Sequence, residues 1–269
     1  MPLAFSTLGA PGAGPDEIVR LALRNGAAGV ELRAGADQPV DVATPAARRA
    51  AVRGVFDGAG ITVLAVASYV RVCDPGPDHE VVDTLRRHAD LAAALGAGAL
   101  RVFPGAAGAG REGDRRAVAR LSRFAALADP AGPRILLETH DSHPRGADVR
   151  AVLAALDGVA PGHPCGAIWD VLHPWRDGEA PDHTAAALRP WLEYVQFKDG
   201  TPDGVTPLGD GTVPLDEIAA LVGERWWSFE WERAWHPHLA PLDVALPAAA
   251  AWYRSHVLGR VTPGPPSPR

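Results

Sequence analysis

The sequence predicts an α/β fold, a closed (β/α)₈ barrel that occupies a single domain. Eight short apolar segments recur along the chain, and longer segments rich in Ala, Leu and Arg, with apolar residues at helical spacing, lie between them. The 269 residues and 47% hydrophobic content suffice for one large barrel. No linker-like segment interrupts the series before residue 260. The alternation therefore favours one continuous barrel over two small domains.

The expected strands are short runs of β-branched and apolar residues, spaced by roughly the length of one βα unit. Alternating strands and helices of this kind place the strands parallel, with a crossover helix after each strand. The eight segments are 3–8 (LAFSTL), 29–34 (GVELRA), 62–68 (TVLAVAS), 99–104 (ALRVFP), 134–140 (RILLETH), 166–171 (GAIWDV), 194–199 (YVQFKD) and 227–232 (WSFEWE).

The intervening helices have recognisable start and stop signals. Pro15-Asp16-Glu17 opens the first helix and Asn25-Gly26 closes it, while glycines at 58–60 and 96–98 end the second and third. An open doubly wound sheet is the alternative. However, the loop after the first strand, GAPGAG at 9–14, contains a proline and lacks the spacing of a dinucleotide-binding turn. Eight units in one series thus predict a TIM barrel over residues 1–258.

Composition excludes several classes of partner. The formal net charge of −6 argues against a surface built to bind nucleic acid or an anionic membrane, and favours a small polar substrate. Cys73 and Cys165 are too few for a disulfide framework, so we expect ordinary thiols. No basic leader and no long apolar stretch is present, which predicts a cytoplasmic protein. The protein could also form a homo-oligomer. The proline-rich tail at 259–269 is expected to be disordered.

Each of the last four expected strands has a polar residue near its end. These residues are Glu138, Asp170, Gln196 and Glu230. Residues at the carboxyl ends of barrel strands face the active-site mouth, so consecutive strands bring such groups close to one point. Converging carboxylates repel one another unless a cation lies between them. The four residues therefore predict a site for one divalent metal ion, although any one carboxylate taken alone could equally pair with an arginine.

The sequence resembles the sugar phosphate isomerase/epimerase family, the xylose isomerase-like TIM barrels that also include AP endonuclease family 2 enzymes. The resemblance extends to about residue 256. It rests on Glu138 in LLETH, on Asp170 and His173 in WDVLH, on Lys198-Asp199 in VQFKD, on the loop 208–211 (LGDG) and on Glu230 in SFEWE.

The resemblance implies a metal held by Glu138, Asp170, the residue at 196 and Glu230. Members of this family typically have histidine where this chain has Gln196. Because glutamine ligates through its carbonyl oxygen, the site is expected to favour Mn²⁺ or Mg²⁺, with Zn²⁺ or Co²⁺ as the alternatives. Glu138 and Glu230 are then the catalytic pair: one removes a carbon-bound proton next to a carbonyl and the other returns it, through an enediolate.

Five further residues are candidates for contact with a polyhydroxylated substrate. His173 follows the sixth strand, and His140 and Glu232 have the same side-chain parity as Glu138 and Glu230. A shifted register would make Glu232 a metal ligand in place of Glu230. Lys198 is the only lysine of the chain and could stabilise an enolate oxygen, or it could form an ion pair with Asp199 or another carboxylate. Glu31, at the second strand, is the fifth candidate.

The predicted function is isomerisation or epimerisation of a sugar, sugar phosphate or keto-polyol. A lyase of the inosose dehydratase type, or one that cleaves C-glycosides, would use similar residues. A DNA repair endonuclease would need extra histidines and a basic groove, which this chain lacks. A barrel that binds a sugar or a partner protein without metal is the alternative from another class.

Overall fold

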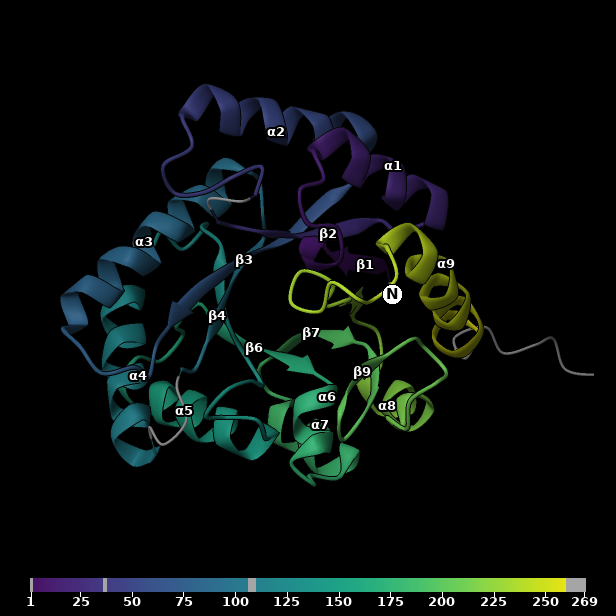
Figure 1. Ribbon diagram of the computed structural model, residues 1–269. Coiled ribbons are helices and arrows are strands. Elements are labelled where there is room, and N and C mark those ends of the chain that lie inside the picture. The colour runs from purple at the N-terminus through teal and green to yellow at the C-terminus, as the bar shows by residue number, and fades with distance from the viewer. Residues whose placement is uncertain (1, 36–37, 106–109, 260–269) are drawn as a thin grey trace, which may run out of the picture.

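A computed structural model describes residues 2–35, 38–105 and 110–259. Eight parallel strands close into a barrel in the order β1-β10-β7-β6-β5-β4-β3-β2, and the helices form a ring around it (Figure 1). The barrel strands are β1 (Leu3–Ser6), β2 (Gly29–Arg33), β3 (Thr62–Arg71), β4 (Ala99–Phe103), β5 (Arg134–Glu138), β6 (Cys165–Asp170), β7 (Leu192–Phe197) and β10 (Trp226–Phe229). The predicted barrel is confirmed.

The helices α1 to α8 lie in the connections between consecutive barrel strands, and α9 follows the last strand. They are α1 (Pro15–Asn25), α2 (Ala46–Ala59), α3 (Asp78–Ala94), α4 (Gly110–Ala125), α5 (Gly146–Val159), α6 (Leu172–Arg176), α7 (Pro181–Leu188), α8 (Leu215–Val222) and α9 (Leu242–Tyr253). Two short segments, η1 (Thr7–Gly9, a 3₁₀-helix) and η2 (Arg254–Leu258, a π-helix), follow β1 and α9. The predicted helix ends are confirmed where Gly26 and Gly60 adopt left-handed conformations after α1 and α2.

Several strand boundaries differ from the sequence prediction. The first strand ends at Ser6, because the side chain of this residue accepts the amide of Leu8 and starts the 3₁₀ turn. The last barrel strand ends at Phe229, so Glu230 and Glu232 lie in the following loop. Asp199 begins β8 (Asp199–Thr201), which forms a two-stranded antiparallel sheet with β9 (Gly204–Thr206) outside the barrel.

Two hydrophobic clusters explain why polar groups gather at one end of the barrel. The large cluster lies between strands and helices, where β-strand residues of one parity face the helices. The small cluster fills the barrel interior with Ala65, Ala99, Leu136, Ile168 and Tyr194. The residues two positions later on these strands point the same way and form the next layer, toward the carboxyl ends of the strands. That layer contains three of the predicted site residues, Glu138, Asp170 and Gln196.

Three other expectations concern the termini, the cysteines and the membrane. The predicted disordered tail lies outside the described residues from residue 260 onward. Cys73 and Cys165 are buried free thiols. Within the described ranges, the helices are all too short or too polar to traverse a bilayer.

Candidate active site

Three of the four predicted ligands meet at the carboxyl ends of the strands. Glu138 ends β5, Asp170 ends β6, and Glu230 directly follows β10. Carboxylate oxygens of all three lie within 4.8 Å of one another, and all three side chains are buried. Glu232 is not part of this cluster. Of the two glutamates that the sequence offered at the last strand, Glu230 is therefore the one that lies beside Glu138 and Asp170.

Gln196 of β7 lies beside this cluster. Its Nε2 donates hydrogen bonds to Glu31 Oε2 at 3.1 Å and to Glu230 Oε1 at 3.3 Å. Its Oε1 is buried and, among the described residues, has no hydrogen-bond partner. A buried carbonyl oxygen without a donor costs free energy unless a cation or a ligand donor approaches it.

Lys198 places its ammonium among three carboxylates. Nζ lies 2.7 Å from Asp170 Oδ2, 2.5 Å from Glu230 Oε2 and 2.6 Å from Glu232 Oε1. The side chain is 1% exposed. Lys198 is therefore the internal counter-ion of the cluster. Of the alternatives drawn from the sequence, pairing with neighbouring carboxylates is what the structure contains.

Asp199 has a different partner set. Its carboxylate accepts the backbone amides of Gly200, Gly209, Gly211 and Val213 at 2.8–3.3 Å. These bonds fold the loop that carries the LGDG motif back onto the start of β8. Because the carboxylate already occupies the Gly209 and Gly211 amides, they do not form a phosphate cradle.

The carboxylates differ in their protonation. Burial raises the pKa of Glu138 to about 8, although the nearby Arg101 guanidinium acts in the opposite direction. Burial also raises the pKa of Asp170 to about 6, against the effect of Lys198. For Glu230, the charges of Lys198 and Arg101 outweigh burial, and its pKa lies below the usual value. Near neutral pH and without a metal ion, Glu230 is thus ionised and Glu138 is mainly protonated.

Glu31 and Glu232 lie on different sides of the cluster. Glu31 is fully buried beneath it and accepts hydrogen bonds from Tyr194, Gln196 and Ser228. It does not line the pocket that opens above the cluster. Glu232 does line that pocket and bonds Lys198.

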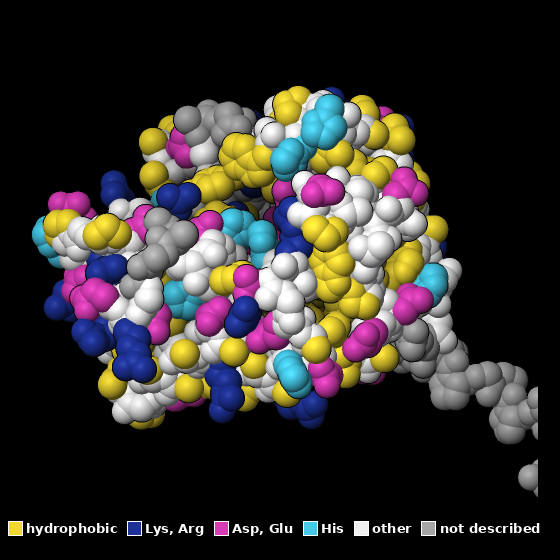
Figure 2. All heavy atoms as spheres, turned by 60° about the horizontal axis from the view of Figure 1, so that its bottom comes forward, with side chains coloured by type: hydrophobic (Ala, Val, Ile, Leu, Met, Phe, Trp, Pro, Cys, Tyr) yellow, Lys and Arg dark blue, Asp and Glu magenta, His cyan; other side chains and the backbone are white. Residues whose placement is uncertain are grey.

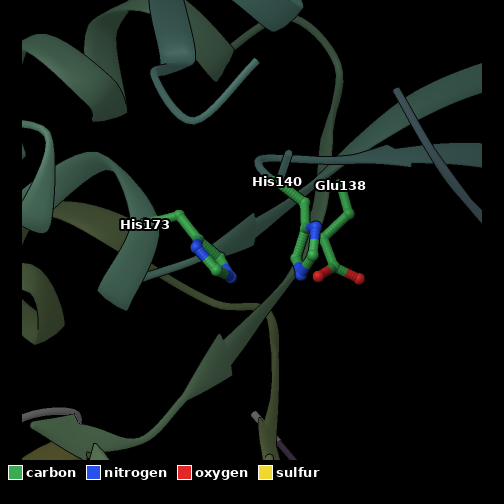
Figure 3. Close-up of side chains that lie close together, drawn as sticks. All are labelled: Glu138, His140 and His173. Carbon is green, nitrogen blue, oxygen red and sulfur yellow. The ribbon is translucent and has the colours of Figure 1, made fainter. Parts of the chain in front are cut away.

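His140 and His173 form the mouth side of the site. Atoms of Glu138, His140 and His173 lie within 4.8 Å of one another. Figure 3 shows the His140 imidazole next to the Glu138 carboxylate and the His173 imidazole on the other side of His140. The two rings meet edge to face with centroids 4.3 Å apart. Burial lowers the pKa of His173 well below its usual value. For His140, the Asp141 and Glu138 carboxylates outweigh burial and raise the pKa. The pair therefore combines a neutral and a more basic imidazole.

A pocket of about 90 Å³ opens above Glu138 and Glu230. A hollow is visible in Figure 2 among hydrophobic, basic and histidine side chains. The pocket walls include Tyr69, Phe103, Trp235, Arg33 and Arg101. The Arg33 guanidinium lies 5.0 Å from the Trp235 ring, and that of Arg101 lies 4.0 Å from the Phe103 ring.

Sequence reasoning missed several of these wall residues. Tyr69 was missed because β3 extends to Arg71, three residues beyond the predicted strand. Phe103 could have been found, since it has the same parity as Arg101 and lies nearer the mouth. Arg101 donates to Glu138 Oε2 at 3.0 Å, so one of the predicted ligand carboxylates pairs with an arginine, the alternative that the sequence left open for any one of them.

Comparisons with known proteins agree with this architecture. The family model described as "Xylose isomerase-like TIM barrel" matches residues 19–256. None of the curated proteins compared with the sequence matches it.

Among solved structures, the chain is similar to the probable 3-DHS dehydratase AsbF of Bacillus anthracis, with 20% identity and a TM-score of 0.76 over 94% of this chain and 98% of that one. The chain is also similar to the IOLI protein with a bound zinc atom, with 16% identity and a TM-score of 0.81 over 96% of this chain and 99% of that one. A third similar structure is the D-allulose 3-epimerase of Methylomonas sp., with 17% identity and a TM-score of 0.71 over 95% of this chain and 98% of that one. At these identities, the likeness shows the fold.

Proposed function

Because the chain belongs to the xylose isomerase-like TIM barrel family, we propose that it is a metal-dependent isomerase or epimerase of a sugar or keto-polyol. The observation that carries the proposal is the pair of glutamates at the base of the pocket. Glu138 and Glu230 approach within 4.8 Å, and their surroundings move their pKa values in opposite directions. Two carboxyls of this kind supply one proton donor and one proton acceptor.

The donor set fits a hard divalent cation. Five carboxyl groups gather here, on Glu31, Glu138, Asp170, Glu230 and Glu232. Among the described residues, Lys198 and Arg101 are the only lysine or arginine side chains that form ion pairs with them. Glu138, Asp170, Glu230 and the Oε1 of Gln196 would hold the ion through oxygen atoms, which favours Mg²⁺ or Mn²⁺. A bound ion would polarise a substrate carbonyl and acidify the neighbouring carbon-bound proton.

A second group of potential ligands shares one residue with the first. Glu138, His140 and His173 offer one oxygen and two nitrogens, a set that suits Zn²⁺ or Co²⁺. We favour the carboxylate set, since its three members are all buried, whereas His140 and His173 are partly exposed.

The side chains divide the proton transfer between them. Ionised Glu230 removes the proton from the carbon next to the carbonyl, and Lys198 keeps Glu230 ionised. Glu138 returns a proton to the opposite face of that carbon in an epimerase, or to the adjacent carbon in an isomerase. Arg101 orients Glu138 through the 3.0 Å bond. The aromatic walls limit water at the reacting carbon.

Free or glycosylated sugars are the favoured substrates within this class. The loop after β7 is a frequent phosphate site in this fold, but here its Gly209 and Gly211 amides are bonded to Asp199. We therefore expect a substrate without a phosphate group at that position.

A second candidate function is elimination of water from the same kind of substrate. The raised pKa of His140 and its place within 4.8 Å of Glu138 would allow it to protonate a departing hydroxyl. A dehydratase and an epimerase share the first proton removal, so one experiment addresses both.

Deuterium incorporation tests the proposal. Free ketoses, keto-inositols and keto-glycosides are incubated with the enzyme and Mn²⁺ or Mg²⁺ in D₂O and followed by proton NMR. We expect exchange at the carbon next to the carbonyl, and its loss in Glu138→Gln and Glu230→Gln. Glu112→Gln, at an exposed carboxylate of α4, is the matched control and should retain exchange. New carbon-bound proton signals from a dehydrated product would identify the eliminating reaction. Exchange that survives both pocket variants would refute the assignment, and a fully active metal-free enzyme would refute metal dependence.

A further inference from the structure

Asp141 occupies an unusual backbone position beside the active site. Its φ of 49° is the only positive φ of a non-glycine residue in the described part of the chain. Asp141 and Ser142 are the central residues of a tight turn. His140 and His143 close this turn by exchanging two backbone hydrogen bonds, at 3.1 Å and 2.9 Å. Glycine is the usual residue where the first central position of such a turn has a positive φ, so an aspartate there calls for a role of its side chain.

The Asp141 carboxylate faces the His140 imidazole. Its Oδ1 lies 2.9 Å from His140 Nδ1, and its Oδ2 lies 3.9 Å from Arg71 Nε. Aspartate commonly tolerates a left-handed backbone by bonding nearby main-chain amides, but no amide of the described residues donates to this carboxylate. His140 Nδ1 is buried, and within the described ranges it has no hydrogen-bond partner other than this carboxylate beside it. The side chain of Asp141 thus serves the histidine rather than the turn.

The backbone of the turn is held in place without this carboxylate. The Ser142 amide donates to the Gly105 carbonyl at 3.1 Å. His143 is 4% exposed, and its Nε2 lies 2.9 Å from Asp114 Oδ1 of α4. Its Nδ1 lies 2.8 Å from Ser142 Oγ. These contacts fix the turn to α4 and to the loop after β4, so removal of the Asp141 side chain should leave the turn intact.

Aromatic packing sets the plane of the His140 ring but not its orientation within that plane. The ring centroids of Phe103 and His173 each lie 4.3 Å from that of His140. A half-turn about the Cβ–Cγ bond would keep this packing while exchanging Nδ1 with Cδ2 and Nε2 with Cε1. The polar contact of Nδ1 with Asp141 favours one of the two orientations. In that orientation Nε2, the nitrogen farther from the backbone, lies beside the Glu138 carboxylate (Figure 3).

We propose that Asp141 is a positioning residue that holds His140 with Nδ1 toward the turn and Nε2 toward the pocket, where Nε2 contacts the substrate. His140 lines this pocket, and Asp141 does not. A flipped ring would present a C–H group in place of Nε2, which could neither bond a substrate hydroxyl nor exchange a proton with it. The inference rests on the proposed function, because His140 would act on the substrate of the same pocket.

Two substitutions at one position separate the side chain from the backbone. Asp141→Gly removes the carboxylate and suits a left-handed backbone. Asp141→Asn tolerates that backbone too, and either polar atom of its amide can bond Nδ1, so the ring orientation is kept. Proton NMR of the full-length protein with Mg²⁺ detects the downfield signal of a hydrogen-bonded His140 Nδ1–H, which is assigned by its absence in His140→Gln. Deuterium exchange with the ketose and keto-polyol panel gives the rate, and Tm monitors the fold.

We expect the wild type to show the Nδ1–H signal and Asp141→Gly to lose it while melting close to the wild type. Because misplacement of a reacting group by 1 Å can cost up to about 100-fold, exchange should slow about tenfold or more in Asp141→Gly and less than about threefold in Asp141→Asn. The inference is overturned if the signal is absent from the wild type or survives in Asp141→Gly. Equal exchange rates in the two variants would also overturn it.

The remaining outcomes are decided as well. If Asp141→Gly does not fold, the turn depends on the carboxylate, and the positioning role is overturned. If the wild type incorporates deuterium into no member of the panel, the proposed function is overturned. The NMR comparison of the wild type with Asp141→Gly needs no substrate, so it still decides whether Asp141 holds His140.

Discussion

Replacing Lys198 with methionine tests the electrostatic design of the site. The ammonium lies within 2.7 Å of oxygens on Asp170, Glu230 and Glu232, and the side chain is 1% exposed. Methionine fills nearly the same volume without the charge. The variant therefore leaves three neighbouring carboxyl groups without their common cation and creates no large cavity.

The magnitude follows from the burial of the pair. Removing one partner of a buried ion pair typically costs about 3–5 kcal/mol, because the remaining charge stays buried and uncompensated. For domains of 150–250 residues, each kcal/mol lowers Tm by roughly 2–4 °C. We therefore expect metal-free Lys198→Met to melt roughly 6–20 °C below the wild type. The free energy of unfolding should fall by about 3–5 kcal/mol in urea.

The assay compares the buried pair with an exposed one. Arg53→Met breaks the Arg53–Asp57 pair, whose side chains are 49% and 63% exposed, and should change stability by no more than about 1 kcal/mol. Added Mn²⁺ should stabilise Lys198→Met more than the wild type, since the ion would replace the missing positive charge. If Lys198→Met loses no more stability than Arg53→Met, the assignment of Lys198 as the internal counter-ion is wrong.

Three further predictions concern the metal, the pH dependence and the loop after β7. Gln196→His should tighten Zn²⁺ or Co²⁺ binding, since imidazole is a softer ligand than an amide oxygen; unchanged affinity in a calorimetric titration would place Gln196 outside the ligand set. The raised pKa of Glu138, about 8, means that the folded protein binds more protons than the unfolded chain. The contribution of Glu138 to stability is therefore present at low pH and lost as pH rises from about 4.5 to 8. In urea titrations over that pH range, the free energy of unfolding should fall less for metal-free Glu138→Gln than for the metal-free wild type. Equal falls in the two proteins would contradict the raised pKa of Glu138. A Cβ on Gly211 would lie 2.1 Å from Asp199 Oδ1, whereas a Cβ on Gly204 would meet no atom within 4 Å. Gly211→Ala should therefore lower the free energy of unfolding by about 1–3 kcal/mol, and Gly204→Ala should lower it far less. Equal melting temperatures of the two variants would show that Asp199 does not organise the loop.

The barrel and the approximate place of its active site could be predicted because both depend on local patterns. Short apolar runs separated by helical segments determine the fold class, and the carboxyl end of each strand marks the mouth. These patterns place Glu138, Asp170 and Glu230 together at the mouth, and in the structure their carboxylate oxygens lie within 4.8 Å of one another.

Strand ends were less predictable, since they depend on individual hydrogen bonds. The Ser6 side chain ends β1 by accepting the amide of Leu8, and β3 continues to Arg71, past the Ser68 side chain, which bonds the Arg101 carbonyl of β4. This extension carries Tyr69 into the pocket wall. A sequence pattern gives the parity of a residue on its strand but not the point at which the strand stops pairing.

The sequence by itself determined which residues face the barrel interior, because side-chain parity along a strand is a local property with a period of two. Only the tertiary structure decided which of them meet. Glu31 bonds Tyr194 across 163 positions of the chain and Ser228 across 197, and Lys198 pairs with carboxylates of β6 and of the loop after β10 rather than with the adjacent Asp199. These contacts require the closed barrel, since its closure and stagger set which strand ends approach one another across the interior.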